Sequence, residues 1–511
     1  MHKRIIYTSV LILAMLLSCS SCNKYLTLLP QDGIIRQEFW QNKEQVQAAV
    51  IGIYASLLQN SASSSTSATV VVVGTNATDR SVAECMFNWG EIRGDNVSAG
   101  PGVSNDAGNM IAGNILPTNS ITSWTAMYRT INLCNTFIKY APAVVGIDGT
   151  FTTASLNAYM AEAFTLRALM YFYLVRSFGD VPLKLTPTSS DADLVQLTTT
   201  PQATVLKQIV ADLTTAAANA VFTYGDRASD KGRITRYTVY ATQADVYLWL
   251  EDYANCITAC DKIINSGQFG YVAGDSGFFN TLYFNGNSNE SIFELQFDTQ
   301  ALNPFYPMFG LVPIFLANPN VLTNVFPVDA NNPDNPDIRS AVNINVGSSF
   351  IWKYISLDAT HLRGVTTSYA HWIVYRYADI TLMKAEACAW SNRTADALSI
   401  INDVRRRAHA ITLTQENPDL TDPLSVSNYV MDERDRELMY EGKRWYDILR
   451  NAKRNNYANI GILLNIVAAS APPASQQSIL NKYKDHNSHY FPIFFNEIQN
   501  DPNLVQNPFY K

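Results

Sequence analysis

The 511-residue sequence contains little charge and no extended basic region. Charged residues make up 16% of the chain, against about 25% in a typical globular protein, and apolar residues make up 47%. The net charge is −7, and the longest basic run is Arg405-Arg406-Arg407. A nucleic-acid-binding protein needs a basic face that neutralises phosphates, so the composition argues against that class. The high apolar content excludes a disordered chain.

The sequence also lacks the short motifs of common catalytic and nucleotide-binding sites. It has no P-loop, no dinucleotide-binding glycine fingerprint, no HExxH and no GxSxG, and its histidines show no ligand spacing. One acidic and basic cluster runs from Asp432 to Glu437. Paired carboxylates serve glycoside hydrolysis, but most of these acids have a base three or four residues away on an expected helix, which favours internal ion pairs. We expect no enzyme, no metal site and no cofactor, with a surface glycosidase as an alternative.

The seven cysteines do not form a disulfide pattern. Those beyond Cys22 are scattered and odd in number, which is a poor disulfide framework. Cys256 and Cys260 lie four positions apart on an expected helix, but no further ligand is near. We expect both to be buried as small apolar residues.

The N-terminus has the features of an export signal. Residues 2–4 are His-Lys-Arg, and the uncharged segment from Ile5 to Leu17 is too short to span a bilayer but typical of a signal peptide. Cys19 and Cys22 follow among small residues, which resembles the lipobox of bacterial lipoproteins. Cys19 has the better lipobox, because Leu16 lies three residues before it. A plain secretory signal is the alternative. An acylated cysteine would anchor the chain without a spanning helix.

Helical periodicity dominates the remainder. Apolar residues recur at helical spacing from Leu156 to Ser177, and Gly179 and Pro182 end that segment. Two helix pairs are expected at 237–264 and 377–408, each with small alanines where helices approach and an aromatic residue near the turn. This pattern is typical of tetratricopeptide units, here at irregular spacing.

Long segments rich in Gly, Pro, Asn and Ser separate these helices. They include residues 60–69, 94–120 and 299–345, and the last carries seven prolines, so long helices are not expected there. Their aromatic content argues against disorder. The sequence therefore predicts a mostly α fold, a degenerate tetratricopeptide-like helix-pair scaffold with long irregular loops and minor β structure, for example at 292–297.

Several motifs along the chain belong together in one protein family. They are Cys22-Asn23-Lys24-Tyr25-Leu26, Glu91-Ile92-Arg93-Gly94-Asp95-Asn96, Phe178-Gly179-Asp180-Val181-Pro182-Leu183, Gly232-Arg233-Ile234-Thr235, Ile401-Asn402-Asp403-Val404-Arg405-Arg406-Arg407-Ala408, Glu441-Gly442-Lys443-Arg444-Trp445-Tyr446-Asp447 and Gln506-Asn507-Pro508-Phe509-Tyr510. With these motifs the sequence resembles the SusD-like (RagB/SusD) outer-membrane lipoproteins of Bacteroidetes-type bacteria, although Phe509 stands where Gly is usual. The first motif favours Cys22 over Cys19 as the acylated residue.

The resemblance implies a nutrient-uptake protein that is not an enzyme. Members of the family are lipid-anchored at the outer face of the outer membrane and bind oligosaccharides, or in some cases peptides. They sit over a SusC-like TonB-dependent transporter and deliver ligand to it, and their helix pairs pack against that transporter. The expected organisation is a signal peptide at 1–21 and one SusD-like domain at 22–511. Its N-terminal part, about 22–330, carries the ligand-binding loops, and its C-terminal part spans about 331–511.

A carbohydrate site needs exposed aromatic platforms and a few polar groups that orient the sugar. We expect such platforms in loops, because aromatic residues on helices usually belong to the core. The candidate residues are Trp89, with Arg93, Asp95 and Asn96 after it, and Phe305, Tyr306 and Phe309 among the prolines. The alternatives are that Trp89 packs inward, and that the aromatic residues near 305 contact the transporter or form a small core of their own loop.

Overall fold

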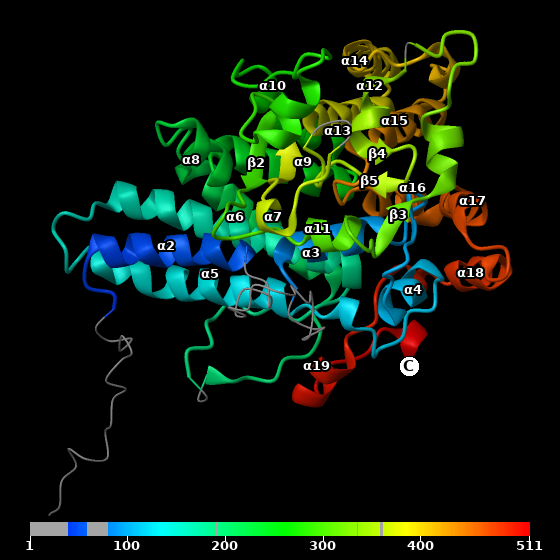
Figure 1. Cartoon of the computed structure of the whole chain (residues 1–511). Helices are drawn as coiled ribbons and strands as arrows, with labels where there is room; N and C mark the ends of the chain where they lie inside the picture. The colour runs from blue at the N-terminus through cyan, green and yellow to red at the C-terminus, as the bar shows by residue number, and fades with distance from the viewer. Residues whose placement is uncertain (1–38, 59–79, 191–192, 335, 358–360) are drawn as a thin grey trace, which may run out of the picture.

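Helices form most of the regular structure in the computed structural model, which describes residues 39–58, 80–190, 193–334, 336–357 and 361–511 (Figure 1). The expected signal peptide, Cys19, Cys22 and the segment 60–69 lie outside these residues. The helices are α2 (Lys43–Leu58), α3 (Val82–Glu91), α4 (Asn105–Ile111), α5 (Thr125–Val144), α6 (Thr153–Phe178), α7 (Gln202–Asn219), α8 (Arg227–Gly232), α9 (Arg236–Trp249), α10 (Tyr253–Ile264), α11 (Phe305–Phe309), α12 (Ile338–Asn343), α13 (Tyr377–Trp390), α14 (Thr394–Arg407), α15 (Pro423–Leu438), α16 (Arg444–Tyr457), α17 (Ile460–Ser470), α18 (Gln476–Tyr483) and α19 (Phe495–Asn500).

The long helix α6 begins and ends where the sequence provides caps. The Thr152 side chain accepts the backbone N–H of Ser155 at the start, and Gly179 takes a φ of 76° at the end. Nearly all side chains from Ala161 to Phe178 are buried, so this half of the helix is surrounded by other elements. The predicted helix at 156–177 is therefore confirmed and lies in the centre of the scaffold.

The other long helices pack on one another in a continuous series. Each of α2, α5, α6, α7, α9, α10, α13 and α15 contacts the next, and Figure 1 shows α2 and α5 side by side at one end of the series. The expected pairs at 237–264 and 377–408 are α9 with α10 and α13 with α14, and α10 packs against α13. Both predicted pairs are confirmed as neighbouring units of the scaffold.

Two small sheets complete the fold. One has the strand order β1 (Val97–Ala99), β3 (Phe315–Ala317), β5 (Phe350–Ile351) and β4 (Ile344–Asn345). The other pairs β2 (Ser291–Leu295) with β6 (Trp372–Arg376) in antiparallel fashion, and it is buried throughout. The strand expected at 292–297 is β2, so the predicted mostly α class with minor β structure is confirmed.

Two of the loop-rich segments, 94–120 and 299–345, contain short helices and strands among their described residues. The segment 94–120 contains β1 and α4, and the serine before α4 caps it by accepting the N–H of Ala107. Within 299–345 the prolines leave only short helices, namely α11, a π-helical turn at Val321–Val325 and α12. These segments fold back on the scaffold, and one hydrophobic core cluster includes residues from Trp40 to Leu504.

The five cysteines among the described residues are free thiols and are buried, as expected for Cys256 and Cys260. In the same part of the chain, no helix is both long and apolar enough to cross a bilayer.

The helix α3 approaches the turn between α15 and α16 so closely that a side chain at Gly90 would overlap the carbonyl of Gly442. We expect Gly90→Ala to lower the free energy of unfolding by about 3 kcal/mol, the upper end of the usual overpacking cost. The matched control is Gly52→Ala in α2, where an added Cβ meets no atom within 4 Å. It should stabilise the protein by up to about 1 kcal/mol. Urea unfolding of both variants measures this, and equal effects would contradict the close approach.

Candidate ligand-binding site

Trp89 is a core residue, so its interpretation as a sugar platform is wrong. It lies on α3 rather than in a loop, with no exposed surface, and its indole N–H donates to the carbonyl of Ile121 at 2.8 Å. Its ring packs edge-on against Phe178 at a centroid distance of 5.1 Å. The alternative that Trp89 packs inward is therefore the correct one.

The aromatic residues near position 305 also face the interior. Phe305 and Phe309 have no exposed surface, and Phe305 stacks on Tyr354 with a ring-centroid distance of 4.6 Å and lies 5.3 Å from Trp372. Their prediction as an exposed platform is wrong, because both side chains belong to the main hydrophobic core. Tyr306 alone of this group is partly exposed.

The polar residues after Trp89 connect distant parts of the chain. The Arg93 guanidinium lies between the rings of Trp445 and Phe491, at 4.1 and 3.8 Å, and donates to the carbonyl of His489. Asp95 accepts two bonds from Arg444 at 2.6 and 2.7 Å. Asn96 is buried and donates to Asp435 at 2.6 Å. These contacts occupy Arg93, Asp95 and Asn96 in tertiary structure, and the structure does not gather them around an open cavity.

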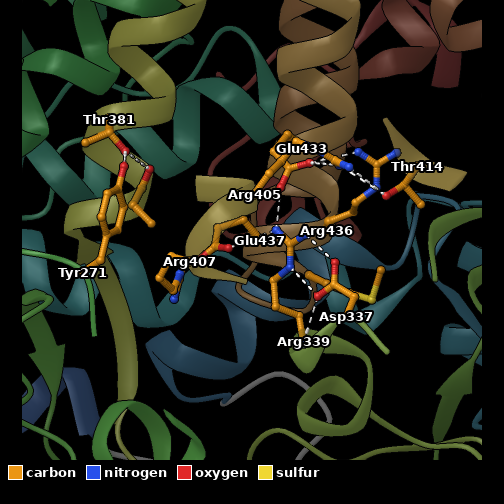
Figure 2. A network of polar contacts seen from close by, with 12 residues as sticks. Tyr271, Asp337, Arg339, Thr381, Arg405, Arg407, Thr414, Glu433, Arg436 and Glu437 are labelled. Atoms are coloured by element: carbon orange, nitrogen blue, oxygen red, sulfur yellow. Dashed lines mark hydrogen bonds and ion pairs between the residues drawn. The ribbon is translucent and has the colours of Figure 1, made fainter. Parts of the chain in front are cut away.

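The charged run on α15 forms buried ion pairs, as expected, but with other partners than its helical neighbours (Figure 2). Glu433 accepts from Arg339 at 2.6 Å and from Arg405 at 3.1 Å, while Glu437 accepts from Arg339 at 3.1 Å. The single pair in this group at helical spacing is Glu433 with Arg436, at 3.0 Å. The carboxylates are held by cations that lie far away in sequence.

Arg376 is the most connected cation of this group. It donates to Glu290 and Glu437 at 2.6 Å and to both oxygens of Glu441 at 3.0 Å. Burial alone would raise the pKa of Glu437, but the charges of Arg407, Arg376 and Arg339 outweigh it and hold this pKa well below its usual range. A carboxylate in this state cannot donate a proton near neutral pH, so the cluster is structural.

Glu91 is a buried carboxyl group in a different environment. Its Oε1 accepts the backbone N–H groups of Gly442 and Lys443 at 2.7 and 3.1 Å, and Oε2 has no partner. Burial raises the pKa of Glu91 to about 8, because these two N–H groups only partly offset the loss of water.

A groove between the FGD motif and the C-terminal segment has a volume of about 250 Å³. Its polar groups are already bonded within the protein. Asp180 accepts the N–H of Gln202, the Gln506 amide makes two bonds to the backbone of Ile493, and Asn507 donates to the carbonyl of Asn487. Two of the family motifs thus meet here to join the chain's end to α6. A third hollow, beside the proline-rich segment, has a volume of only about 80 Å³.

The groove beside α8 is the best candidate for a ligand site among the described residues. It has a volume of about 390 Å³, which lies in the usual range for small-molecule sites. Phe222 is 49% exposed, its ring lies 5.3 Å from that of Tyr237, and Tyr237 packs against Phe269 at 5.1 Å. Arg236 covers the Phe222 ring at 4.4 Å, and Lys231 lies 4.3 Å from the Phe269 ring. Aromatic faces and polar groups therefore share one open cavity.

Local capping interactions fix the walls of this groove. Asp226 caps α8 by accepting the N–H of Ser229, and Asp230 accepts the N–H of Tyr224 and the hydroxyl of Thr223. The chain turns at Gly225, directly before Asp226, where φ is 94°. The groove is thus preformed by a turn between α7 and α9.

The sequence analysis did not select these groove residues. The available signal was an aromatic residue, Phe222, shortly before a Gly225-Asp226 turn and ahead of the helix expected from residue 237. We found no group of three or more metal-ligating side chains in the part of the chain that the structure describes.

Two family models together match most of the chain. The model described as "SusD family" matches residues 272–510, and the model described as "Starch-binding associating with outer membrane" matches residues 25–248.

Comparisons with individual proteins agree with these matches. The chain is 25% identical to SusD-like protein P38 of Formosa agariphila over 87% of this chain and 90% of that protein, and 25% identical to SusD-like protein P25 of the same organism over 89% of each. A SusD superfamily protein from Bacteroides vulgatus superposes with a TM-score of 0.72 at 19% identity, over 92% of this chain and all of that one. NanU of B. fragilis gives a TM-score of 0.69 at 20% identity, over 95% of this chain and all of that one. These structures share the fold.

The raised pKa of Glu91 predicts a pH dependence of stability. The folded pKa is about 8 against 4.5 for the free group, so between these values the folded protein holds a proton that the unfolded chain has lost. The free energy of unfolding should fall as the pH rises through this window, by about 1.4 kcal/mol per unit of pKa difference at most. Glu91→Gln keeps an acceptor for Gly442 and does not ionise, so it should flatten this slope.

Urea unfolding at about pH 5 and about pH 8 measures the effect, with Glu386→Gln as the control. Burial would raise the pKa of Glu386, but Arg450 and Arg454 lower it to about 2, so its contribution is lost between 4.5 and about 2 as the pH falls. The control should leave the slope between about pH 5 and 8 unchanged. Parallel slopes for Glu91→Gln and the wild type would disprove the assignment.

Proposed function

The chain belongs to the SusD family of non-catalytic binding proteins associated with the outer membrane, and from this we propose that it captures oligosaccharides at the cell surface and delivers them to a SusC-like TonB-dependent transporter. The family models match both halves of the chain, and one of them describes starch-binding proteins. Because family members are non-catalytic, the family supports a binding protein over a surface glycosidase.

The observation that carries the proposal is the groove beside α8. It combines an exposed Phe222 ring with Tyr237 and several polar side chains in a cavity of about 390 Å³. Pyranose rings have apolar faces and polar edges, so they match a surface of this kind. Residues of the turn between α7 and α9 would hold the sugar while the helix scaffold keeps them in place.

A peptide receptor of the RagB type is the alternative. A peptide would also use aromatic contacts, but it would additionally need partners for its backbone N–H and C=O groups. Titration of the protein with both oligosaccharides and peptides separates the two functions, because the proposal requires sugar binding in the absence of peptide.

The N-terminal residues, which lie outside the described part of the structure, would provide the anchor. We expect cleavage before Cys22, acylation of Cys22 and display of residues 22–511 at the outer face of the outer membrane, with Cys19 as the alternative site. Mass spectrometry of the N-terminal peptide from detergent-extracted protein identifies the acylated residue. A TonB-dependent transporter should co-purify in the same extract. An N-terminal peptide without acyl mass would contradict the anchor, and a pure lipoprotein without transporter would contradict the partner.

Phe222→Ala tests the groove directly. We expect the affinity for a bound oligosaccharide to fall by about 2 kcal/mol, the loss typical of a binding hot spot, with little change in thermal stability because the ring is half exposed. The matched control is Phe495→Ala on α19, where the side chain is 46% exposed and does not line the groove. Calorimetric titration and melting curves measure both. Equal affinities for the two variants would place the ligand elsewhere.

A further inference from the structure

Lys231 is a buried cation that lines the α8 groove and forms no ion pair with a carboxylate of the described residues. Only 8% of its surface is exposed, and its ammonium donates to the carbonyl of Ser291 at 2.5 Å. The two other buried lysines of the described chain each pair with a carboxylate at 2.8 Å, Lys353 with Glu441 and Lys443 with Asp379. A buried charge is costly unless it is paired, and the charge of Glu294 on β2 offsets only part of this cost, so an anion bound in the groove would stabilise Lys231.

A second cation, Arg227, also lines the groove, and the two carboxylates of the lining are already bonded within the protein. Arg227 is exposed, lines the groove, and forms no ion pair with any carboxylate of the described residues. Both oxygens of Asp230 accept bonds from the turn, and Asp226 is bonded to the first turn of α8. The acidic residues therefore hold the loop together, whereas both cations retain N–H groups for a ligand.

We propose that the α8 groove selects acidic oligosaccharides, with a carboxylate or sulfate of the sugar bound by Lys231 and Arg227 and the sugar ring lying against Phe222. This inference rests on the proposed glycan-binding function and specifies its substrate class. A uronic acid carboxylate and a sulfate ester present the same chemistry, namely a compact group of anionic oxygens that accepts charge-assisted hydrogen bonds. A neutral sugar in the same place would remove water from Lys231 without replacing it by an anion.

The lowered pKa of Lys231 agrees with this geometry. Burial lowers the pKa of Lys231 to about 8, and Glu294 on β2 offsets part of this shift, while Arg227 and Asp230 on α8 act in opposite directions. A bound anion stabilises the protonated form. Affinity for an acidic oligosaccharide should therefore fall as the pH rises from about 7 to about 9, and affinity for a neutral one should not.

The test compares acidic oligosaccharides with neutral counterparts of the same backbone. The probes are tetragalacturonate and the same oligomer with its carboxyl groups reduced to alcohols, and a κ-carrageenan tetrasaccharide, whose galactan backbone contains no uronic acid, with its desulfated form. Calorimetric titration of the full lipid-free protein should show at least about tenfold tighter binding of one acidic probe than of its neutral form. The two pairs distinguish a carboxylate from a sulfate as the bound group.

Two variants assign the preference to the cations. Lys231→Met and Arg227→Gln should each reduce the acidic-over-neutral ratio toward one, whereas Arg406→Gln, an exposed arginine on α14, should leave it unchanged. A melting curve accompanies each variant, and Arg227→Gln decides the question if Lys231→Met does not fold.

The outcomes separate this inference from the function on which it rests. Equal or tighter binding of the neutral probes overturns the selection of acidic sugars and leaves glycan binding in place, as does an unchanged ratio in Arg227→Gln. Absence of binding by every oligosaccharide, or binding of peptides only, overturns both.

Discussion

The buried ion pairs around Arg376 are the interaction on which the arrangement of the elements depends. Arg376 ends β6, and its partners Glu290, Glu437 and Glu441 come from the start of β2, the end of α15 and the turn after it. Burying these charges costs several kcal/mol per ion unless every one is paired. All of these charges are paired in the observed arrangement of β2, β6 and α15, and a shift of one element would leave buried charges unpaired. Net stability must come mainly from the apolar core.

The α8 groove depends on the same network through β2. Arg376 holds Glu290, and the next residue, Ser291, provides the carbonyl that accepts the Lys231 ammonium. A shift of β2 would remove this acceptor and move the buried cation. The groove is lined on one side by α8 and on another by residues that include Asn289, which lies just before the strand β2 that the ion pairs fix. This backing would keep the turn rigid enough for a ligand site.

The sequence predicted the scaffold but not the site. Periodic apolar residues sufficed for α6, for the pair α9 and α10 and for the pair α13 and α14, because helix formation and helix packing use local spacing. The sequence predicted that the acids of α15 form ion pairs. It did not predict most of their partners, such as Arg339, because tertiary structure brings these from beyond helical spacing. Trp89 is no platform because it lies on the buried helix α3 and not in a loop, whereas Phe305 and Phe309 lie in a loop-rich segment but are not exposed. In this chain long loops cover the scaffold and contribute their aromatic residues to the core. Phe222 differs from them, since it lies in the connection between α7 and α8 and remains 49% exposed.

The overall charge and the local charge of the molecule act differently on an acidic ligand. The net charge of −7 repels such a ligand at long range, but ionic screening limits this repulsion to roughly 8 Å at physiological salt. Within the groove the Lys231 ammonium lies in partly desolvated surroundings, where charge interactions are stronger than in water. The same desolvation acts against a neutral sugar, because covering an unpaired ammonium removes its remaining water without compensation. One buried cation therefore favours the acidic ligand and penalises the neutral one, so specificity arises as a difference between the two binding free energies.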